Sequence, residues 1–356
     1  MIILYPFIIA FIITTLITPL SLMVIKKMGL LDDPKIHKHP GMIHKKPTPR
    51  GGGIPLFIGI LITGIFFLPF TKAVIALFVA GSIALLIGVI DDKYDISPYL
   101  RFIVNIAVAL IVVTAGITVP FITNPFGGIL YLNSIILPID FLGFHLPIVL
   151  SDIVAVLWII WVMNMLNWSK GVDGQMPGIV AISAVTIGLL SLRFAGSDSF
   201  SKVGADLSFI IAGASLGFLI FNFHPAKIFP GYGATAVYLL LSAVSILSGA
   251  KLATAILVMG VPMMDGLFTI LRRLGARRSP FWHDKKHLHH LLLSFGVGQR
   301  HIALFYWIIS AILGTLALVL SSKEKLFAII MLLIVVGGTL LFLHRILKNS
   351  YDKDRL

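Results

Sequence analysis

The run AVIALFVAGSIALLIGVI, residues 73–90, contains no charged residue, and Asp91 and Asp92 follow it directly. A helix of about 20 apolar residues crosses the roughly 30 Å hydrocarbon core of a bilayer. A carboxylate inside or at the edge of a membrane costs about 2.5–3.5 kcal/mol on insertion scales, so such acids are functional candidates. The stretch therefore predicts a transmembrane helix that ends in chemically useful acids.

Similar apolar runs recur along the chain. The 356 residues are 58% hydrophobic and only 12% charged, with a mean hydropathy of +1.01, whereas a soluble domain has about 25% charged residues. This composition excludes a soluble globular protein, a disordered chain and a nucleic-acid-binding protein. We expect an all-α integral membrane protein with a single polytopic domain over residues 1–356. Eleven spans are predicted, at about 2–25, 52–70, 73–90, 101–119, 152–167, 176–193, 206–222, 235–250, 252–271, 302–320 and 326–347.

The basic residues predict the orientation. With the N-terminus outside, most of the 28 Lys and Arg and nearly all of the 11 His fall on the inner side, as the positive-inside rule requires. The net charge of +13 reflects either topology alone or attraction to anionic lipids or a phosphorylated substrate. The first span reads as a retained helix rather than a signal peptide.

Two further features bound the chemistry. The chain has no cysteine, which excludes disulfides, thiolate metal sites and cysteine nucleophiles. The outer segment 120–151 contains turn signals and partial alternation, which favour a hairpin on the outer surface. We therefore expect any catalytic groups on the cytoplasmic side, in a groove that opens there.

The inner segment after residue 90 carries Asp91, Asp92 and Asp95. Paired carboxylates bind Mg²⁺ together with substrate phosphate, or one of them acts as a base. Solvated acids in an interfacial loop are the alternative.

Two other inner segments combine amides with an acid or an aromatic residue. Asn164 and Asn167 project from one helix face, and Asp173 follows between two glycines, an arrangement suited to hydrogen bonding with a base or sugar. A turn between two helices explains those glycines equally well. Asn222 precedes Phe229, which can stack on a nucleobase or belong to an interfacial aromatic belt.

The most basic inner segment contains His287, His289 and His290 among several Lys and Arg. The surrounding cations favour phosphate binding over a zinc site, because they repel a divalent ion and donate charge-assisted hydrogen bonds to an anion. Lys45 and Lys46 add cations just before the second span.

These five motifs, in this order between spans of this number, resemble the polyprenyl-phosphate N-acetylhexosamine-1-phosphate transferases (the MraY/WecA superfamily, glycosyltransferase family 4). The stretches HKKPTPRGGG, DDKYDISPYLR and HLHHLL are most similar to its WecA/TagO-like branch. The resemblance implies a multi-pass protein of the plasma (inner) membrane with a cytoplasmic active face and a possible homodimer. It implies that sugar-1-phosphate passes from a UDP-N-acetylhexosamine to an undecaprenyl-type polyprenyl phosphate, with Mg²⁺ as cofactor and release of UMP. This is the first membrane step of cell-envelope glycan synthesis.

The resemblance also implies residue roles. Asp91 and Asp92 match the catalytic acidic pair, which deprotonates the lipid phosphate. The positions that match substrate-binding residues of the family are Lys45, Lys46, Asn164, Asn167, Asp173, Asn222, Phe229, His287, His289 and His290, with Asp173 helping to read the uridine and Phe229 stacking on uracil.

Two positions depart from the family pattern. Lys170 and Tyr232 stand where the family has aspartates, and the second of these aspartates is a principal Mg²⁺ ligand. Three interpretations follow: Asp91, Asp92 and Asp173 hold the metal differently, Lys170 replaces the charge of the metal, or the chain binds its substrates without normal turnover.

Overall fold

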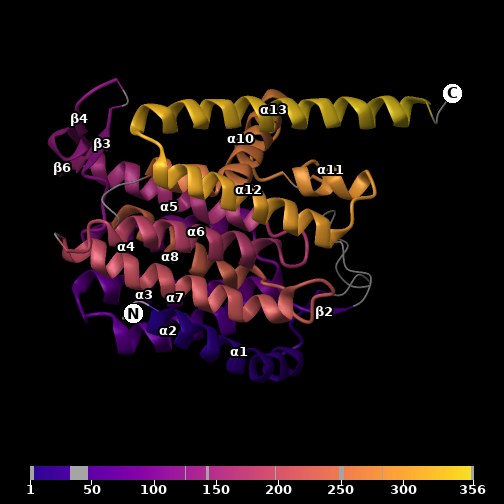
Figure 1. The fold of residues 1–356 in the computed structure, drawn as a ribbon, viewed down its shortest axis with the longest axis horizontal. Helices are drawn as coiled ribbons and strands as arrows, with labels where there is room; N and C mark the ends of the chain where they lie inside the picture. The colour runs from indigo at the N-terminus through magenta and orange to yellow at the C-terminus, as the bar shows by residue number, and fades with distance from the viewer. Residues whose placement is uncertain are drawn as a thin grey trace.

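The protein is described by a computed structural model that covers residues 4–32, 47–124, 126–141, 144–196, 198–247, 252–282 and 284–353. Thirteen α-helices make up most of this part of the chain (Figure 1). They are α1 Leu4–Lys27, α2 Gly53–Phe67, α3 Lys72–Tyr94, α4 Pro98–Thr114, α5 Leu150–Trp168, α6 Gln175–Leu192, α7 Ser199–Asn222, α8 Thr235–Leu247, α9 Leu252–Val258, α10 Gly260–Gly275, α11 Leu288–Ser294, α12 Gln299–Val319 and α13 Ser322–Lys353. The all-α membrane class predicted from the sequence is confirmed.

The predicted number of spans is not confirmed. Each of the eleven predicted segments contains a helix, but among the described residues seven helices (α1, α3, α5, α6, α7, α12 and α13) are individually long and apolar enough to cross a membrane. The pair α9 and α10 adds an eighth if it counts as one bent span. The helices α2, α4 and α8 are apolar but shorter. At 1.5 Å per residue, the 15 residues of α2 reach only about 22 Å.

The interior is centred on α8, all of whose residues are buried. Helices α3, α5 and α7 pack around α8, and α1 packs against α7. Figure 1 shows α13 along one edge of the bundle and α1 with α2 along the opposite edge. A helix that is apolar on every side belongs in such a fully enclosed position.

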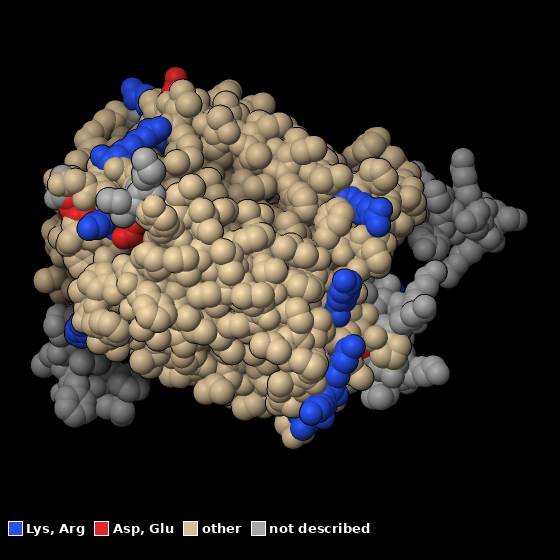
Figure 2. Space-filling model, turned by 60° about the horizontal axis from the view of Figure 1, so that its bottom comes forward, with Lys and Arg blue, Asp and Glu red and all other residues tan. Residues whose placement is uncertain are grey.

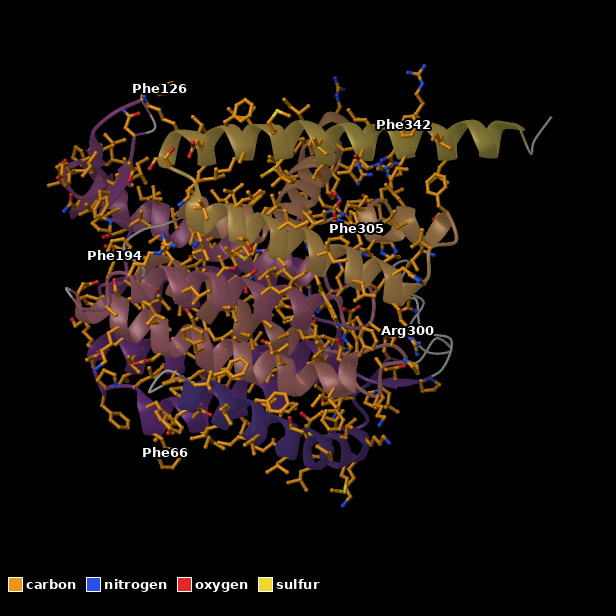
Figure 3. All side chains as sticks on the ribbon, in the orientation of Figure 1. Phe66, Phe126, Phe194, Arg300, Phe305 and Phe342 are labelled. Carbon is orange, nitrogen blue, oxygen red and sulfur yellow. The ribbon has the colours of Figure 1, made fainter. Side chains whose placement is uncertain are left out.

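The surface of the bundle is that of a membrane protein. Figure 2 shows Lys, Arg, Asp and Glu gathered toward the two ends of one face, and none over its middle. Phe342 points outward from α13 and is 63% exposed, and Figure 3 shows Phe66 and Phe126 at the end of the bundle opposite to Arg300. An uncharged belt between two charged ends matches a bilayer core between its headgroups.

Short strands lie at the two ends of the bundle (Figure 1). At one end β3 (Phe121–Thr123) pairs with β4 (Ile129–Tyr131), and β5 (Ile136–Phe141) pairs with β6 (Phe144–Val149), both antiparallel. The hairpin predicted within residues 120–151 is therefore confirmed and is in fact two hairpins, with the 3₁₀ turn η1 (Leu132–Ser134) between them. At the other end β1 (Leu31–Asp32) pairs with β2 (Thr48–Pro49).

The predicted span 252–271 is broken. Helices α9 and α10 meet at an angle of 87°, and Met259 between them lacks regular helical geometry. Pro262 occupies the first turn of α10, where its missing N–H costs nothing. The break directs α10 toward α13 and α5, and α10 carries a buried acid, Asp265.

Candidate active site

The acid pair lies at the end of α3. Asp91 and Asp92 are both buried, and Asp95 ends the helix in a left-handed conformation with φ of 48°. The apolar run 73–90 is thus followed by two carboxylates that lie inside the protein rather than in solvent. Buried carboxylates require charged or hydrogen-bonding partners.

Asp92 is held by an arginine and by backbone amides. Arg50 Nε lies 2.7 Å from Asp92 Oδ1, and Tyr232 N donates to the same oxygen at 2.7 Å. Gly233 N donates to Asp92 Oδ2 at 3.4 Å. Gly231 has a φ of +68°, and a Cβ there would fall 2.1 Å from the Asp92 carboxylate. Only glycine lets this loop approach the acid so closely.

Asp91 has a different environment. Arg101 Nε lies 2.6 Å from Asp91 Oδ1, and Arg50 Nη2 lies 3.8 Å from Asp91 Oδ2. Neither carboxylate oxygen accepts a well-directed hydrogen bond from the described residues. Asp91 is therefore compensated in charge but keeps hydrogen-bonding capacity for a ligand.

Lys170 and Tyr232, the two departures from the family pattern, meet each other here. Lys170 Nζ donates to Gly231 O at 2.7 Å and lies 5.6 Å from the centre of the Tyr232 ring. Arg101 lies over the same ring at 5.2 Å. The Tyr232 hydroxyl accepts a hydrogen bond from Asn105 Nδ2 at 3.3 Å. A carboxylate site of the family has become an aromatic surface that faces two cations.

We refer to Asp91, Asp92, Arg50, Arg101 and Lys170 as the acid centre. Desolvation by burial lowers the pKa of Lys170 to about 7; Arg50 adds to this effect, while Asp92 and Asp91 oppose it. Burial is the main cause of this shift, and the two carboxylates only partly offset it. An anion placed beside Lys170 would favour its charged form.

The acid centre does not fit the Mg²⁺ site that the resemblance implies. Both carboxylates already lie against guanidinium groups, and Lys170 adds a third cation. Within the described ranges, no group of three or more His, Cys, Asp or Glu is arranged to hold a metal ion. The predicted ligand set of Asp91, Asp92 and Asp173 is therefore not brought together. Mg²⁺ favours oxygen ligands in an octahedral arrangement, and three fixed cations oppose it.

The segment between α5 and α6 connects the acid centre to the rest of the site. Lys170 reaches the acid centre, while Asp173 Oδ2 accepts hydrogen bonds from the ring of His224 at 2.8 Å and from Ala226 N at 3.0 Å. Asn164 donates to the backbone oxygen of Ile160. Asn167 Oδ1 is buried and accepts no hydrogen bond from the described residues. Asn167 therefore keeps a buried acceptor oxygen with capacity for a substrate.

Asn222 and Phe229 take part in the backbone framework. The Asn222 side chain accepts from Gly174 N at 3.0 Å and donates to Ile228 O at 2.8 Å, so its amide joins two loops. Phe229 N donates to Pro49 O, and Phe229 O accepts from Gly51 and Gly52. This pairing fixes the position of Arg50, and the Phe229 ring is half-buried. Lys45 and Lys46 lie outside the described residues.

The three predicted histidines lie together on and beside α11. His287 and His289 stack with ring centres 5.7 Å apart, and His289 lies 4.2 Å from His290. His289 packs on Gly171, where any side chain would overlap its ring. Gly171 follows Lys170 directly, so the histidines and the acid centre flank one short loop.

The protonation of these histidines is set mainly by burial. Desolvation, together with the neighbouring His287, lowers the pKa of His290 to about 4. It lowers the pKa of His289 well below its usual value. His289 Nδ1 also lacks a partner among the described residues. These two rings are therefore neutral near pH 7, and their hydrogen bonds rather than their charges are available to a substrate.

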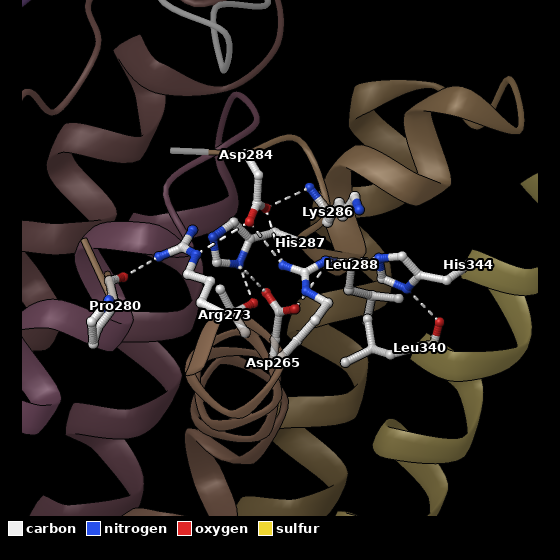
Figure 4. A network of polar contacts seen from close by, with 11 residues as sticks. Asp265, Arg273, Pro280, Asp284, Lys286, His287, Leu288, Leu340 and His344 are labelled. Carbon is white, nitrogen blue, oxygen red and sulfur yellow. Dashed lines mark hydrogen bonds and ion pairs between the residues drawn. The ribbon is translucent and has the colours of Figure 1, made fainter. Parts of the chain in front are cut away.

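Sequence reasoning assigned the cations around the histidines to phosphate binding, but it did not predict the acids that pair with them and hold this segment (Figure 4). Asp265 accepts from His287 Nδ1 at 2.9 Å and from Leu288 N at 3.1 Å. Arg272 donates twice to Asp284, at 3.0 and 3.1 Å, and Arg273 donates to it at 3.2 Å. We refer to Asp265, Arg272, Arg273, Asp284 and His287 as the histidine arm.

A sequence signal for some of these residues existed. Asp265 is an acid within an apolar span, which is a functional candidate by default. Arg101 lies near the start of α4, the helix that follows the acid pair. Because α4 packs against α3, Arg101 comes close to Asp91. The role of Arg50 depends on the pairing of its strand with Phe229, to which it is bridged. No local pattern predicts that pairing.

Comparison with known proteins places this arrangement in a family. A sequence model described as glycosyl transferase family 4 matches residues 74–249. The chain is 32% identical to a probable undecaprenyl-phosphate N-acetylglucosaminyl 1-phosphate transferase of Bacillus subtilis, over 92% of this chain and 88% of the relative. It is 32% identical to a decaprenyl-phosphate N-acetylglucosaminephosphotransferase of Mycobacterium tuberculosis (strain H37Rv), over 88% of this chain and 83% of the relative.

A more distant relative shows the same relationship. The undecaprenyl-phosphate alpha-N-acetylglucosaminyl 1-phosphate transferase of Escherichia coli (strain K12) is 28% identical over 86% of this chain and 80% of its own length. The motifs that carry the resemblance meet around one loop, and the relatives match nearly from end to end. The chain therefore belongs to glycosyl transferase family 4, the family of polyprenyl-phosphate N-acetylhexosamine-1-phosphate transferases.

Proposed function

We propose that this chain transfers N-acetylhexosamine-1-phosphate from a UDP-sugar to an undecaprenyl-type polyprenyl phosphate at the cytoplasmic face of the plasma membrane. The product is a polyprenyl-diphosphate-linked sugar, and the reaction starts the synthesis of a cell-envelope glycan. The observation that carries the proposal is the acid centre. It combines a buried acid that retains hydrogen-bonding capacity with three cations, at the end of a membrane helix where a lipid phosphate arrives.

The reaction needs little covalent chemistry from the protein. An oxygen of the lipid phosphate attacks the β-phosphorus of the UDP-sugar and forms a new P–O bond. The bond between that phosphorus and the oxygen that bridges to the α-phosphorus breaks, and UMP leaves with the electron pair. Arg50, Arg101 and Lys170 offset the negative charge of the two phosphorylated substrates.

Asp91 is suited to be the proton acceptor. When the lipid phosphate carries one proton, its transfer to a carboxylate oxygen of Asp91 leaves a better nucleophile. Asp92, which accepts bonds from Arg50, Tyr232 N and Gly233 N, instead fixes the loop that carries Tyr232. The two acids thus divide the roles of base and anchor.

The nucleotide sugar is proposed to extend from the acid centre, where its phosphates lie, across the loop 169–174. The Phe229 ring stacks on uracil, Asn167 Oδ1 accepts a hydrogen bond from the nucleotide sugar, and the neutral His289 and His290 contact the sugar. Asp173 is ordered by His224 and Ala226. It shapes the loop that separates the two substrates.

The deciding experiment measures turnover. Purified protein in nanodiscs receives undecaprenyl phosphate and either radiolabelled UDP-N-acetylglucosamine or UDP-N-acetylgalactosamine, and the lipid-linked product is quantified. We expect product from one of the two donors and release of UMP in equal amount. The Bacillus subtilis relative, assayed in parallel, is the positive control. Absence of product with both donors, while that control is active, would reject the proposed function.

The orientation is tested separately. Since the chain has no native cysteine, Lys285→Cys and Lys323→Cys each introduce a single thiol at an exposed position. A membrane-impermeant maleimide applied to intact cells should label the Lys323→Cys variant and not the Lys285→Cys variant. The reverse result would place the active face outside.

Mass photometry of the nanodisc-free protein tests the predicted homodimer.

A further inference from the structure

The strongest feature that the proposed reaction leaves unexplained is the pair Lys170 and Tyr232. In the family pattern these positions hold aspartates, and one of them ligates the metal. Here Lys170 Nζ is fixed by Gly231 O and lies over the Tyr232 ring, and the charges of Arg50, Arg101, Asp91 and Asp92 act on it. The substitution is therefore not a loss of two acids in an open cavity. It is a packed arrangement with partners of its own.

We propose that Lys170, together with Arg50 and Arg101, binds the diphosphate of the nucleotide sugar directly and replaces the divalent cation of the family. This inference rests on the proposed function for the identity of the ligand, a nucleoside diphosphate. It concerns the way in which the diphosphate is held. The same cations are the ones that oppose a metal ion at this place.

The balance of charge favours an anion. Two buried carboxylates face two guanidinium groups and one ammonium group. Asp95 also pairs with Arg101, at 2.5 Å, but its side chain is 60% exposed and solvent screens its charge. A divalent cation would add two positive charges to a buried core that already holds three cations against two carboxylates when Lys170 is protonated. A diphosphate brings negative charge and accepts hydrogen bonds from all three cationic side chains, which is the interaction that Arg and Lys make best with phosphate.

The geometry favours a fixed site over a flexible one. Lys170 is held at Gly231 O, Arg50 by the pairing of Thr48–Pro49 and Phe229 with neighbouring strands, and Arg101 by Asp91 at 2.6 Å. Such donors need little reorganisation when charge develops in the transition state. In the family a metal ion supplies fixed positive charge. In this chain the side chains of Lys170, Arg50 and Arg101 supply it instead.

The first test measures binding without turnover. The affinity of UDP for the purified protein is determined by isothermal titration in EDTA and again in Mg²⁺, with uridine as a probe that lacks phosphates. We expect the affinity for UDP to change less than about two-fold between EDTA and Mg²⁺. UDP binding that appears only with Mg²⁺ would overturn the inference, even if no variant could be made.

The second test removes the charge of Lys170. Lys170→Met should weaken UDP binding in EDTA by about ten-fold or more and leave uridine binding unchanged, and Lys170→Arg should retain most of the affinity. Lys323→Met is the matched control, because it removes one lysine from an exposed position just beyond the far end of α12. Equal affinity of the Lys170→Met variant and the parent protein for UDP would also overturn the inference.

The third test attempts to restore a metal site. The double variant Lys170→Asp with Tyr232→Asp is titrated with Mn²⁺, whose binding is followed by electron paramagnetic resonance. We expect tight Mn²⁺ binding in the double variant and none in the parent protein. A parent protein that binds Mn²⁺ tightly and stoichiometrically, and loses it on Asp91→Asn, would contradict the inference.

Failure of this inference and failure of the proposed function are distinguishable. Lipid-linked product that forms only with Mg²⁺ and disappears in EDTA would support the proposed transferase activity but reject Lys170 as a replacement for the metal ion. UDP binding that is independent of metal, without any product, would support the cationic diphosphate site but reject the proposed transfer.

Discussion

The acid centre and the histidine arm both contain buried carboxylates, but they compensate them in different ways. In the acid centre Asp92 meets partners that are distant in sequence, Arg50 and the loop at Tyr232, while Asp91 meets Arg101 from the next helix. The histidine arm is built within residues 265–288. One cluster is assembled by the tertiary fold and the other by a single local segment.

The difference extends to hydrogen bonding. Asp284 accepts from Arg272, Arg273 and Lys286 N, and Asp265 accepts from His287 and Leu288 N. Asp91, by contrast, accepts no well-directed hydrogen bond from the described residues. A fully bonded carboxylate stabilises its surroundings, whereas a carboxylate with open lone pairs is suited to a ligand. We therefore expect the acid centre to control chemistry and the histidine arm to control position and stability.

The largest effect is expected from reversing the charge of Lys170. At an effective dielectric constant of about 20, two unit charges 4 Å apart interact by about 4 kcal/mol. Lys170→Asp alone should therefore reduce transfer by about three orders of magnitude, because it places an unpaired acid beside the diphosphate. Product formation in EDTA is the measurement. Activity in Lys170→Asp similar to that of the parent protein would remove Lys170 from the acid centre.

Asp91→Asn should have the next largest effect. It removes a charge with little change in volume, and loss of an acid–base group reduces turnover by about 10²-fold or more. The thermal midpoint should change little, since neither oxygen of Asp91 accepts a well-directed hydrogen bond from the described residues and Arg101 keeps Asp95 as an ionic partner. Asp92→Asn should also impair turnover but lower the thermal midpoint more, because Arg50 and two backbone amides lose a charged partner. Full activity in both variants would exclude the pair from the mechanism.

Phe229→Ala separates the two substrates. Its backbone pairing with Pro49, Gly51 and Gly52 does not depend on the ring, so Arg50 should stay in place. Loss of stacking should weaken UDP binding by roughly 1–3 kcal/mol and leave the apparent KM for polyprenyl phosphate unchanged. If both ligands bind more weakly by the same factor, or neither does, the ring is only an interfacial anchor.

In the histidine arm, Asp265→Asn should have a smaller effect of a different kind. Asparagine keeps one acceptor oxygen, so it can accept from Leu288 N but meets His287 Nδ1 with an N–H group, which requires the other tautomer of the histidine. As a positioning residue, Asp265 should affect kcat by about ten-fold with little change in the KM for the nucleotide sugar. A loss of thermal stability without this split between kcat and KM would mean that Asp265 serves the fold alone.

The contrast between the two clusters also explains what the sequence could predict. Hydrophobic runs predicted a helix in each of the eleven segments, and turn signals predicted a hairpin within residues 120–151, because both depend on local composition. The motifs at residues 91–92, 164–173 and 287–290 were found because acids, amides and clustered histidines are rare beside apolar spans.

The remaining features depend on distant contacts. Arg50 looked like one of many basic residues on one face, and only the fold joins it to Asp92. The amide of Asn222 was predicted to bind substrate, but the fold uses both of its polar atoms to join backbone segments. The bend between α9 and α10 was missed because hydropathy is continuous through Met259, so a single span was predicted there.

The smallest expected effect concerns pH and belongs to the histidine arm and its neighbours. The pKa of His290 is lowered to about 4 and that of His289 well below its usual value, mainly by burial, whereas an unfolded histidine has a pKa of about 6.5. Below about pH 6.5 the unfolded chain therefore binds protons that the folded chain does not. The contribution of these rings to the free energy of unfolding should be constant above that pH and fall as the pH drops toward about 4.

The thermal midpoint of the protein in nanodiscs, measured from about pH 7 to about pH 5, should accordingly fall by a few degrees, and His290→Gln should make the decline shallower. Asp284 does not confound this window, because Arg272 and Arg273 outweigh its desolvation and keep its pKa below the usual value for aspartate, so it loses its charge only in more acidic solution. A midpoint that rises as the pH falls would show that these rings bind a proton in the folded protein. His289 and His290 would then present cations rather than neutral imidazoles to the substrate.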